Sequence, residues 1–294
     1  MGTQAKVEFE FSDTKQADRL LEKVFAEMHR IDRLMSPFKP DSELTKINQQ
    51  ASQHPVIISD ELFELLEKSE YYSQLTQGAF DISFSSVGYL YDFRKHQRPD
   101  DIQRKALAAE INYQAILLNK TDKSVKFAND KLKIDLGGIA KGHAVDRCID
   151  ILVKHGVKNA FINAGGDSRV IGKKNDRLWY IGIRHPRDES KLIVNLPLEQ
   201  VAISTSGDYE RFFIEDGIRY HHIIDPKTGD SVRNSQSVTI LANTSTIADA
   251  LSTSIFVLGS QKGLELVNKL PNVSAIIINK SGKMMYSDDL VSPN

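Results

Sequence analysis

Asp249 and Thr253 stand four residues apart in an apolar, helix-forming segment, so their side chains are expected on one face of a helix. A carboxylate and a hydroxyl are oxygen ligands, which suit Mg²⁺ better than Zn²⁺. A backbone carbonyl from the glycines at 137–138 would turn this pair into a partial octahedral cage. Substrate phosphates and water would supply the remaining ligands. The alternative is structural: a capping or surface Asp249, and a Thr253 bonded to its own helix.

The two glycines belong to the stretch from Asp135 to Asp146, which reads DLGGIAKGHAVD. The alternating apolar residues from Val125 to Ile134 predict a strand that leads into this stretch, and a helix follows it. Glycines at such a junction let the backbone approach a ligand closely, and the N–H groups of the new helix favour an anion such as phosphate. The stretch is neither a Walker A loop nor a dinucleotide fingerprint, and many junctions of this kind bind nothing.

Two other polar segments could take part in chemistry. His221 and His222 precede a turn that contains Asp225, and a histidine near a carboxylate can act as a general base. The alternative is a turn in which Asp225 bonds to its own backbone and the histidines pack. Residues 204–207, Ser-Thr-Ser-Gly, follow an expected strand and could bind phosphate or form a polar turn. The Gly-x-Ser-x-Gly elbow of a serine hydrolase is absent from the sequence.

Composition narrows the class of protein. The chain has 294 residues, of which 40% are hydrophobic and 26% charged, enough to bury a core. The net charge of -1, without a long basic run, argues against nucleic acid as the main partner. A single cysteine, Cys148, excludes an internal disulfide and a thiolate-ligated zinc site, and it is expected in the core. The sequence shows neither a membrane-spanning stretch nor a signal peptide after Met1.

The elements that must position these residues are predicted from hydrophobic periodicity. The first helix has Asp13 as its cap and is broken by Pro37 and Pro40. Helices are predicted over 14–34, 42–48, 59–72, 102–109, from the central glycines to about 155, 245–256 and 261–269. Strands are predicted over 4–11, 113–118, 124–127, 159–163, 179–183, 193–196, 201–205, 209–214, 219–224, 237–241 and 275–279. Residues 1–120 are helix-rich and residues 121–294 strand-rich, which predicts an α+β fold.

Taken together, these segments resemble the ApbE family of flavin transferases, and the resemblance covers nearly the whole chain. The opening Met1-Gly2-Thr3 is similar to the start of the family pattern, and the segment from Met35 to Asn48 is similar to its Ser-x-Tyr/Phe region. Further motifs follow in the family's order: Gly78–Asp81, Asp135–Gly142, Asn163–Asp167, Ile203–Gly207, His222–Gly229 and Ala248–Thr253. The resemblance implies a single domain over residues 1–294, with antiparallel sheets packed against helices and a cleft shared by its two parts.

The resemblance also implies a reaction and its residues. The family cleaves FAD between its phosphates, moves FMN to a Ser or Thr hydroxyl of a target protein and releases AMP, with Mg²⁺ required. The implied metal ligands are Gly138 through its carbonyl, Asp249 and Thr253. The implied FAD contacts are Met1, Phe38, Ala79, Phe80, Asp81, Asp135, Lys141 and Ile224. His222 is the expected base for the target's hydroxyl, with Asp225 as its orienting partner or substitute and His221 as a competitor.

Two other functions remain open at this point: a metal-dependent FAD pyrophosphatase that yields FMN and AMP, and a flavin-binding carrier without chemistry. The family resemblance implies, as acceptor, a subunit of a membrane-bound electron-transfer or ion-translocating complex. Because family members often carry an export signal or a lipid anchor, a periplasmic or membrane-anchored protein whose signal is missing from this sequence is expected. A cytoplasmic member is the alternative.

Overall fold

The centre of the computed structural model, which describes residues 2–291, is a seven-stranded sheet in which every neighbouring pair of strands is antiparallel. Its order is β1-β5-β6-β9-β12-β13-β14. The bounds are Ala5–Phe9 (β1), Ala160–Ala164 (β5), Asp167–Ile171 (β6), Val201–Gly207 (β9), Ser235–Ala242 (β12), Ser274–Asn279 (β13) and Met284–Tyr286 (β14). The N-terminal strand therefore pairs with a strand from the second half of the chain.

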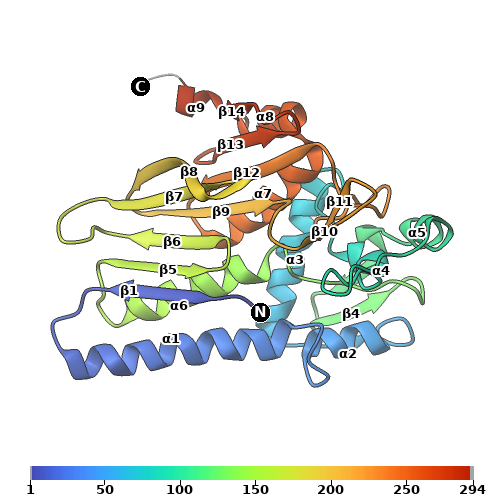
Figure 1. Cartoon of the computed structure of the whole chain (residues 1–294). Coiled ribbons are helices and arrows are strands. Elements are labelled where there is room, and N and C mark those ends of the chain that lie inside the picture. Colours follow the sequence, from blue (N-terminus) through green and yellow to red (C-terminus); the bar gives the residue numbers. More distant parts are fainter. Residues whose placement is uncertain (1, 292–294) are drawn as a thin grey trace.

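Helices cover one face of this sheet: α6 (Ala140–Lys154) packs on β5 and β6, and α7 (Ser245–Leu258) packs on β9 and β12. The long helix α1 (Thr14–Met35) packs on α6 and runs along the bottom of the view in Figure 1. Asp13 caps α1 by accepting the N–H of Gln16 at 3.1 Å, as the sequence predicts. One apolar stripe faces inward because its residues recur every three or four positions. Its buried members are Leu20, Val24, Met28, Ile31 and Met35.

The opposite face of the sheet carries a two-stranded ribbon, β7 (Trp179–His185) and β8 (Asp188–Leu198). Trp179 and Leu198 of the ribbon pack with Val170 of β6 and Ile203 of β9. Side chains alternate between faces along a strand, so Ser204, next to Ile203, points toward the helices instead. Residues of β9 therefore contribute to both sides of the sheet.

The remaining elements surround the helical side. A three-stranded sheet contains β2 (Val56–Ile57), β4 (Ser124–Phe127) and β3 (Ile116–Asn119), and a hairpin contains β10 (Phe212–Glu215) and β11 (Ile218–His221). The other helices are α2 (Glu43–Gln50), α3 (Asp60–Leu75), α4 (Ser85–Gly88), α5 (Asp101–Ala108), α8 (Ser260–Val267) and α9 (Asp288–Val291). Two single 3₁₀ turns lie at Ile82–Phe84 and Tyr113–Ala115.

The predicted α+β class is confirmed, and each predicted helix and strand range overlaps an observed element. Cys148 is fully buried against α1, as expected. Within residues 2–291, none of the helices is long and apolar enough to cross a bilayer. The description of residues 1–294 as one domain stays a prediction.

The strand predicted to continue to Ile134 is wrong, because β4 ends at Phe127. The chain from 128 to 139 has no regular structure, although Leu132 and Ile134 are buried. The amide of Asn48 replaces a neighbouring strand there: it accepts the N–H of Ile134 at 2.8 Å and donates to the carbonyl of Ile134 at 2.9 Å. Burial alone produced the alternating pattern, without a sheet ladder.

Strand β6 is not among the strands predicted from the sequence, and residues 164–167 lead into it. They are the turn of a tight hairpin in which Ala164 pairs with Asp167. Gly165 has a φ of 70°, in the left-handed region where glycine carries no steric penalty. The hairpin places Asp167 at the start of a central strand.

Candidate active site

Lys141 lies between two buried carboxylates at one end of the sheet. Its Nζ is 2.6 Å from Oδ2 of Asp167 and 3.1 Å from Oδ1 of Asp249. Asp249 also accepts the N–H of Gly142 at 3.0 Å. The three charged groups come from α6, β6 and α7, so the cluster joins elements that are far apart in sequence.

The charges of this cluster do not balance, because two carboxylates face one ammonium group. Burial is the largest effect that raises the pKa of Asp249, to about 7, and the nearby Asp167 carboxylate is the second. Lys141 and the N–H of Gly142 act in the opposite direction and lower this pKa. Burial by itself would lower the pKa of Lys141, but Asp167 and Asp249 outweigh it and raise that pKa above its ordinary value. The surplus negative charge makes the cluster receptive to a cation.

The predicted metal ligands lie together beside this cluster. A Cβ at Gly138 would lie 3.2 Å from Oγ1 of Thr253 and 3.3 Å from Cε2 of Phe80, so this backbone closely approaches α7. Thr253 follows Asp249 by one turn of α7. The described residues contain no group of three or more His, Cys, Asp or Glu that could hold a metal ion. A cation here would depend on carbonyl and hydroxyl oxygens as well as carboxylate, the donor set that suits Mg²⁺.

A chain of hydroxyl groups connects Asp167 to Thr253 behind the charged cluster. Ser204 of β9 donates to Oδ1 of Asp167 at 2.5 Å, and its oxygen is 3.0 Å from that of Ser252 on α7. Ser252 is 2.9 Å from Ser206, which is 3.4 Å from Oγ1 of Thr253. The segment 204–207 is therefore neither a polar turn nor, at Ser204, open to a ligand. Its hydroxyls hold α7 in register with β9.

The helix N-terminus expected to bind phosphate is used differently at Gly142. The N–H of Gly142 bonds to the Asp249 carboxylate rather than being free for a ligand. A Cβ at this position would lie 2.2 Å from the carbonyl oxygen of Ser245, so the glycine permits contact between α6 and α7. The expectation of close ligand approach at this third glycine is wrong for that reason.

Asp146 fixes the start of α7, a function that sequence reasoning missed. Its Oδ1 accepts the N–H of Ser245 at 2.9 Å, and its Oδ2 accepts the N–H of Thr246 at 2.8 Å. The guanidinium of Arg169 lies 2.8 Å from Oδ1. Two N–H groups without partners in their own helix are thus satisfied by α6. The spacing of Asp146 from Lys141 on one helix gave no signal of this contact.

The two histidines differ in their surroundings. Nε2 of His221 is 2.6 Å from the carbonyl oxygen of Val232, and Nδ1 accepts the N–H of Ile223 at 3.3 Å. Both ring nitrogens of His221 are therefore used to hold a loop. Nδ1 of His222 is buried and has no hydrogen-bond partner within residues 2–291. The geometry favours His222 over His221 as the candidate base.

The Asp225 carboxylate belongs to a turn. Its Oδ1 accepts the N–H of Lys227 at 2.9 Å, and the Asp225 carbonyl accepts the N–H of Gly229 at 2.8 Å. Within residues 2–291, no hydrogen bond is seen between Asp225 and His222. This is the structural alternative considered for Asp225, and its role beside His222 stays a prediction.

The segment expected to hold the flavin is mostly buried. Ala79 and Phe80 are 7% and 3% exposed, and the Phe80 ring stands against Gly138. The Asp81 carboxylate accepts the N–H groups of Ser83 at 2.8 Å and Tyr113 at 2.9 Å. Burial raises the pKa of Asp81, against the effect of these bonds. Asp81 therefore already positions its own loop, and any contact with FAD would be additional.

The other expected FAD contacts are spread around the site. Phe38 is 87% exposed, whereas Ile224 is 5% exposed in a small apolar cluster with Val87. Oδ1 of Asp135 accepts the N–H of Gly137 at 2.6 Å, and burial raises the pKa of Asp135. Met1 lies outside the described residues. These FAD assignments stay predictions.

His222 gives a prediction for the dependence of stability on pH. Burial, with smaller effects of His221, Arg211 and Lys141, lowers the pKa of His222 to about 3. A histidine in the unfolded chain titrates near about 6.5, so the unfolded state binds the extra proton between these values. Stability is therefore lost as pH falls from about 6.5 toward 3.

Replacing His222 with glutamine should remove this contribution. Between pH 7 and pH 5, the free energy of unfolding of the wild type should fall by about 1–2 kcal/mol more than that of His222→Gln. Urea unfolding at both pH values measures it, and His54→Gln, at an exposed position, controls for loss of a histidine. An equal pH response of wild type and His222→Gln would contradict a His222 ring that stays neutral in the folded protein.

Solved structures of ApbE proteins have the same fold as this chain. The chain superposes on the ApbE protein of Thermotoga maritima with a TM-score of 0.88 at 32% identity, covering 98% of each chain. It superposes on the flavin transferase ApbE of Vibrio cholerae with a TM-score of 0.86 at 28% identity, covering 99% of this chain and 96% of the other. The class of enzyme predicted from the motifs is thereby confirmed.

The ApbE family model matches residues 1–277, and the chain belongs to this family. It is 33% identical to the FAD:protein FMN transferase of Treponema pallidum, over 92% of this chain and 80% of that protein. It is 32% identical to a protein of the same name from Klebsiella pneumoniae, over 92% of this chain and 85% of that protein.

Proposed function

We propose that the chain transfers FMN from FAD to a Ser or Thr hydroxyl of a target protein and releases AMP, in a reaction that requires Mg²⁺. The acceptor oxygen forms a bond to the phosphorus of the FMN half. The bond from that phosphorus to the bridging oxygen breaks, and the bridging oxygen leaves with AMP. The proton of the hydroxyl passes to a base. Membership of the family supports this reaction, and the names of the relatives agree with it.

The residues of the candidate site have separate roles in this reaction. Lys141, held by Asp167 and Asp249, presents an ammonium group at the end of the sheet, where it can orient the diphosphate. His222 is neutral near pH 7, with an unpaired Nδ1 that can accept the hydroxyl proton. Its low pKa limits it to a weak base, so the hydroxyl must be acidified or the proton transferred late.

Gly138, Asp249 and Thr253 would hold Mg²⁺, because the Gly138 backbone lies against Thr253, Asp249 lies one helical turn before Thr253, and the nearby carboxylates carry surplus negative charge. When bound, the ion supplies neutralisation of the diphosphate as charge develops on the leaving phosphate. The single observation that carries the proposal is the cluster of Asp167, Lys141 and Asp249. This cluster lies beside the close contact between the Gly138 backbone and Thr253.

The proposal is tested by mass spectrometry of an acceptor peptide containing Ser-Gly-Ala-Thr, incubated with the chain, FAD and Mg²⁺. A mass gain equal to FMN minus water, abolished by EDTA and restored by added Mg²⁺, is the expected result. FAD cleaved to FMN and AMP with the peptide and a whole acceptor protein unmodified would indicate a pyrophosphatase instead. FAD that is bound and remains intact would indicate a carrier.

A further inference from the structure

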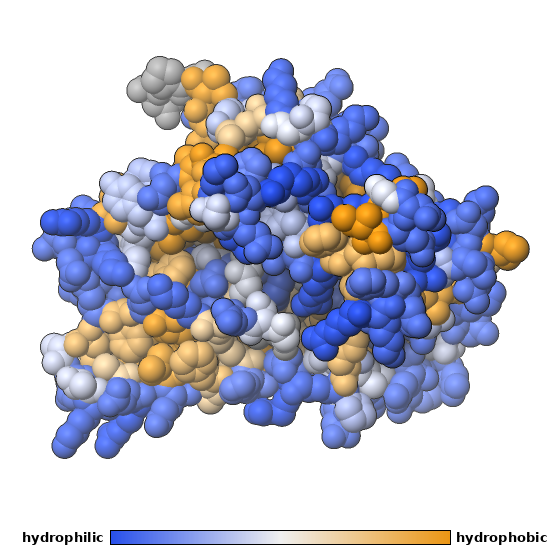
Figure 2. Space-filling model, in the orientation of Figure 1, coloured by the Kyte–Doolittle hydropathy of each residue, from blue (hydrophilic) through white to orange (hydrophobic). Residues whose placement is uncertain are grey.

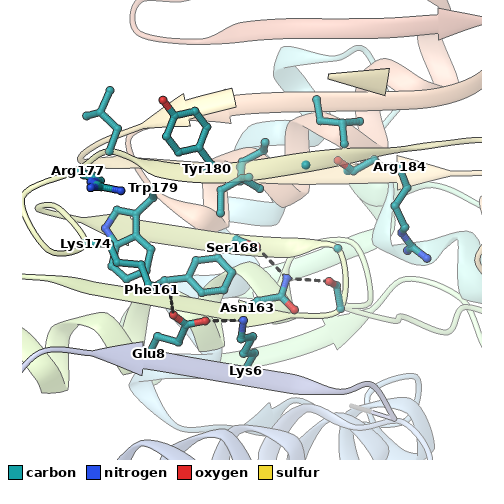
Figure 3. A pocket seen from close by; sticks show the side chains of 18 of the residues that line it. Lys6, Glu8, Phe161, Asn163, Ser168, Lys174, Arg177, Trp179, Tyr180 and Arg184 are labelled. Atoms are coloured by element: carbon teal, nitrogen blue, oxygen red, sulfur yellow. Dashed lines mark hydrogen bonds and ion pairs between the residues drawn. The ribbon is translucent and has the colours of Figure 1, made fainter. Parts of the chain in front are cut away.

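An open groove of about 930 Å³ lies on the sheet face opposite the helices, beneath the β7–β8 ribbon (Figure 3). Its floor is formed by residues of β1, β5, β6 and β9, and its wall by β7. Phe161 of β5 and Trp179 of β7 stack at 5.9 Å between ring centroids, and Tyr180 is 63% exposed. Figure 2 shows apolar surface on this side of the molecule, bordered by hydrophilic side chains.

The wall of the groove is the free edge of a strand. Every residue from Arg177 to Arg184 lines the groove, although neighbouring side chains of a strand point to opposite faces. Such an unbroken run indicates that β7 turns its edge toward the groove. Among the described residues β7 pairs with β8 alone, so its other edge has N–H and C=O groups free of a neighbouring strand. An extended peptide can pair with an edge of this kind.

The groove carries more positive than negative charge, although the whole chain has a net charge of -1. Four cationic residues and two carboxylates line it: Lys6, Lys174, Arg177, Arg184, Glu8 and Glu210. Glu8 pairs with Lys174 at 2.6 Å and also with Lys6, and Glu210 pairs with Arg184. Arg177 is exposed and has no ion-pair partner among the described residues. The groove therefore suits an acidic occupant.

One end of the groove lies at the β5–β6 turn, which leads to the charged cluster on the other face of the sheet. Thr205 lines the groove, while the next residue, Ser206, belongs to the hydroxyl chain that ends at Thr253. Gly166 also lines the groove and precedes Asp167 of the charged cluster. None of the described residues expected to contact FAD or metal lines the groove. A second substrate could lie there while FAD occupies the site.

We infer that this groove binds an extended, acidic segment of the acceptor protein, added as a strand to the free edge of β7. The inference rests on the proposed function, since it names the binding site of the second substrate, the acceptor protein. The hydroxyl to be modified would lie at the end marked by Gly165 and Thr205, beside the turn that leads to Asp167 of the charged cluster. Backbone pairing would supply affinity with little dependence on sequence, and Arg177 with its neighbours would select acidic flanks.

The test measures binding by the full chain in the presence of FAD and Mg²⁺. The probes are two fluorescein-labelled peptides with a Ser-Gly-Ala-Thr core, one flanked by aspartates and one by lysines. Fluorescence anisotropy should show at least tenfold tighter binding of the acidic peptide, weakened by added salt. Arg177→Glu should reduce that affinity at least tenfold and leave FAD affinity within twofold. Lys262→Glu, at an exposed position on α8, is the matched charge control and should change neither.

Hydrogen exchange gives a second readout, because strand addition should protect backbone amides within 177–184. Equal binding of the two peptides by the wild type, or equal effects of Arg177→Glu and Lys262→Glu, would overturn the inference. Competition between FAD and the acidic peptide would also overturn it, because the groove would then hold the flavin. Mass spectrometry of the same samples separates the two proposals. If FMN is transferred without a preference for the acidic peptide, the groove proposal alone is contradicted. If the acidic peptide binds but FMN is not transferred to a whole acceptor protein, the transferase proposal alone is contradicted.

Discussion

Asp249→Ala is expected to lower the rate of FMN transfer at least about 10³-fold, equivalent to about 4 kcal/mol of transition-state stabilisation. The change removes an oxygen donor from the proposed Mg²⁺ site and one of the two carboxylates that hold Lys141. It also leaves the N–H of Gly142 without its acceptor. Single-turnover mass spectrometry of the flavinylated acceptor measures the rate, and isothermal titration with Mg²⁺ measures loss of the ion.

Ser254→Ala is the matched control for this experiment. Ser254 is buried on the same helix, but its hydroxyl donates to the carbonyl of Ala250, at 2.6 Å, and not to a group of the candidate site. Its transfer rate should stay within about twofold of the wild type, since no donor of the site is lost. An Asp249→Ala variant that retained transfer and its dependence on Mg²⁺ would show that the metal is held elsewhere.

Gly142→Ala is expected to destabilise the fold by about 3 kcal/mol and to abolish most transfer, although alanine is the better helix former. The new methyl would lie 2.2 Å from the oxygen and 2.6 Å from the carbon of the Ser245 carbonyl. These are backbone atoms, so α6 and α7 must move apart. The movement would separate Lys141 from Asp249. Urea unfolding, followed by circular dichroism, measures the loss of stability.

Gly88→Ala serves as a comparison at the end of another helix. Its methyl would meet the ring of Phe84 at 3.0 Å, and a half-buried side chain can turn away where backbone cannot. A cost below about 1 kcal/mol is expected there. If both variants proved equally stable, the close approach of α6 and α7 would not be required by the fold.

Sequence patterns predicted the elements whose stability is local. Helix α1 has a cap, a stripe and a proline break within one segment, and β5 alternates buried and half-buried residues. The strand prediction fails over residues 128–134 because the partners of this segment are single side chains, such as Asn48, that lie far away in sequence. A burial pattern records which residues face inward, and it does not record what satisfies their backbone.

The residues of the candidate site could likewise be predicted only where they lie close together in the sequence. Residues within one helix turn, such as Asp249 and Thr253, could be grouped from spacing alone. Asp167 carries no such signal, because its partner Lys141 is on another element and the hairpin that positions it was not predicted. Its contact becomes visible only when β6 takes its place between β5 and β9.

The pairing of β1 with β5 also determines the order in which this protein can be completed during synthesis. Val7 can pair only after Ile162 has been synthesised, and these two partners lie far apart in the sequence. Contacts that close such long loops form slowly, because the entropy of closure is lost before the contact stabilises the chain. The charged cluster needs residues up to Asp249, so a nascent chain shorter than that length lacks this cluster even where its first helices have already formed.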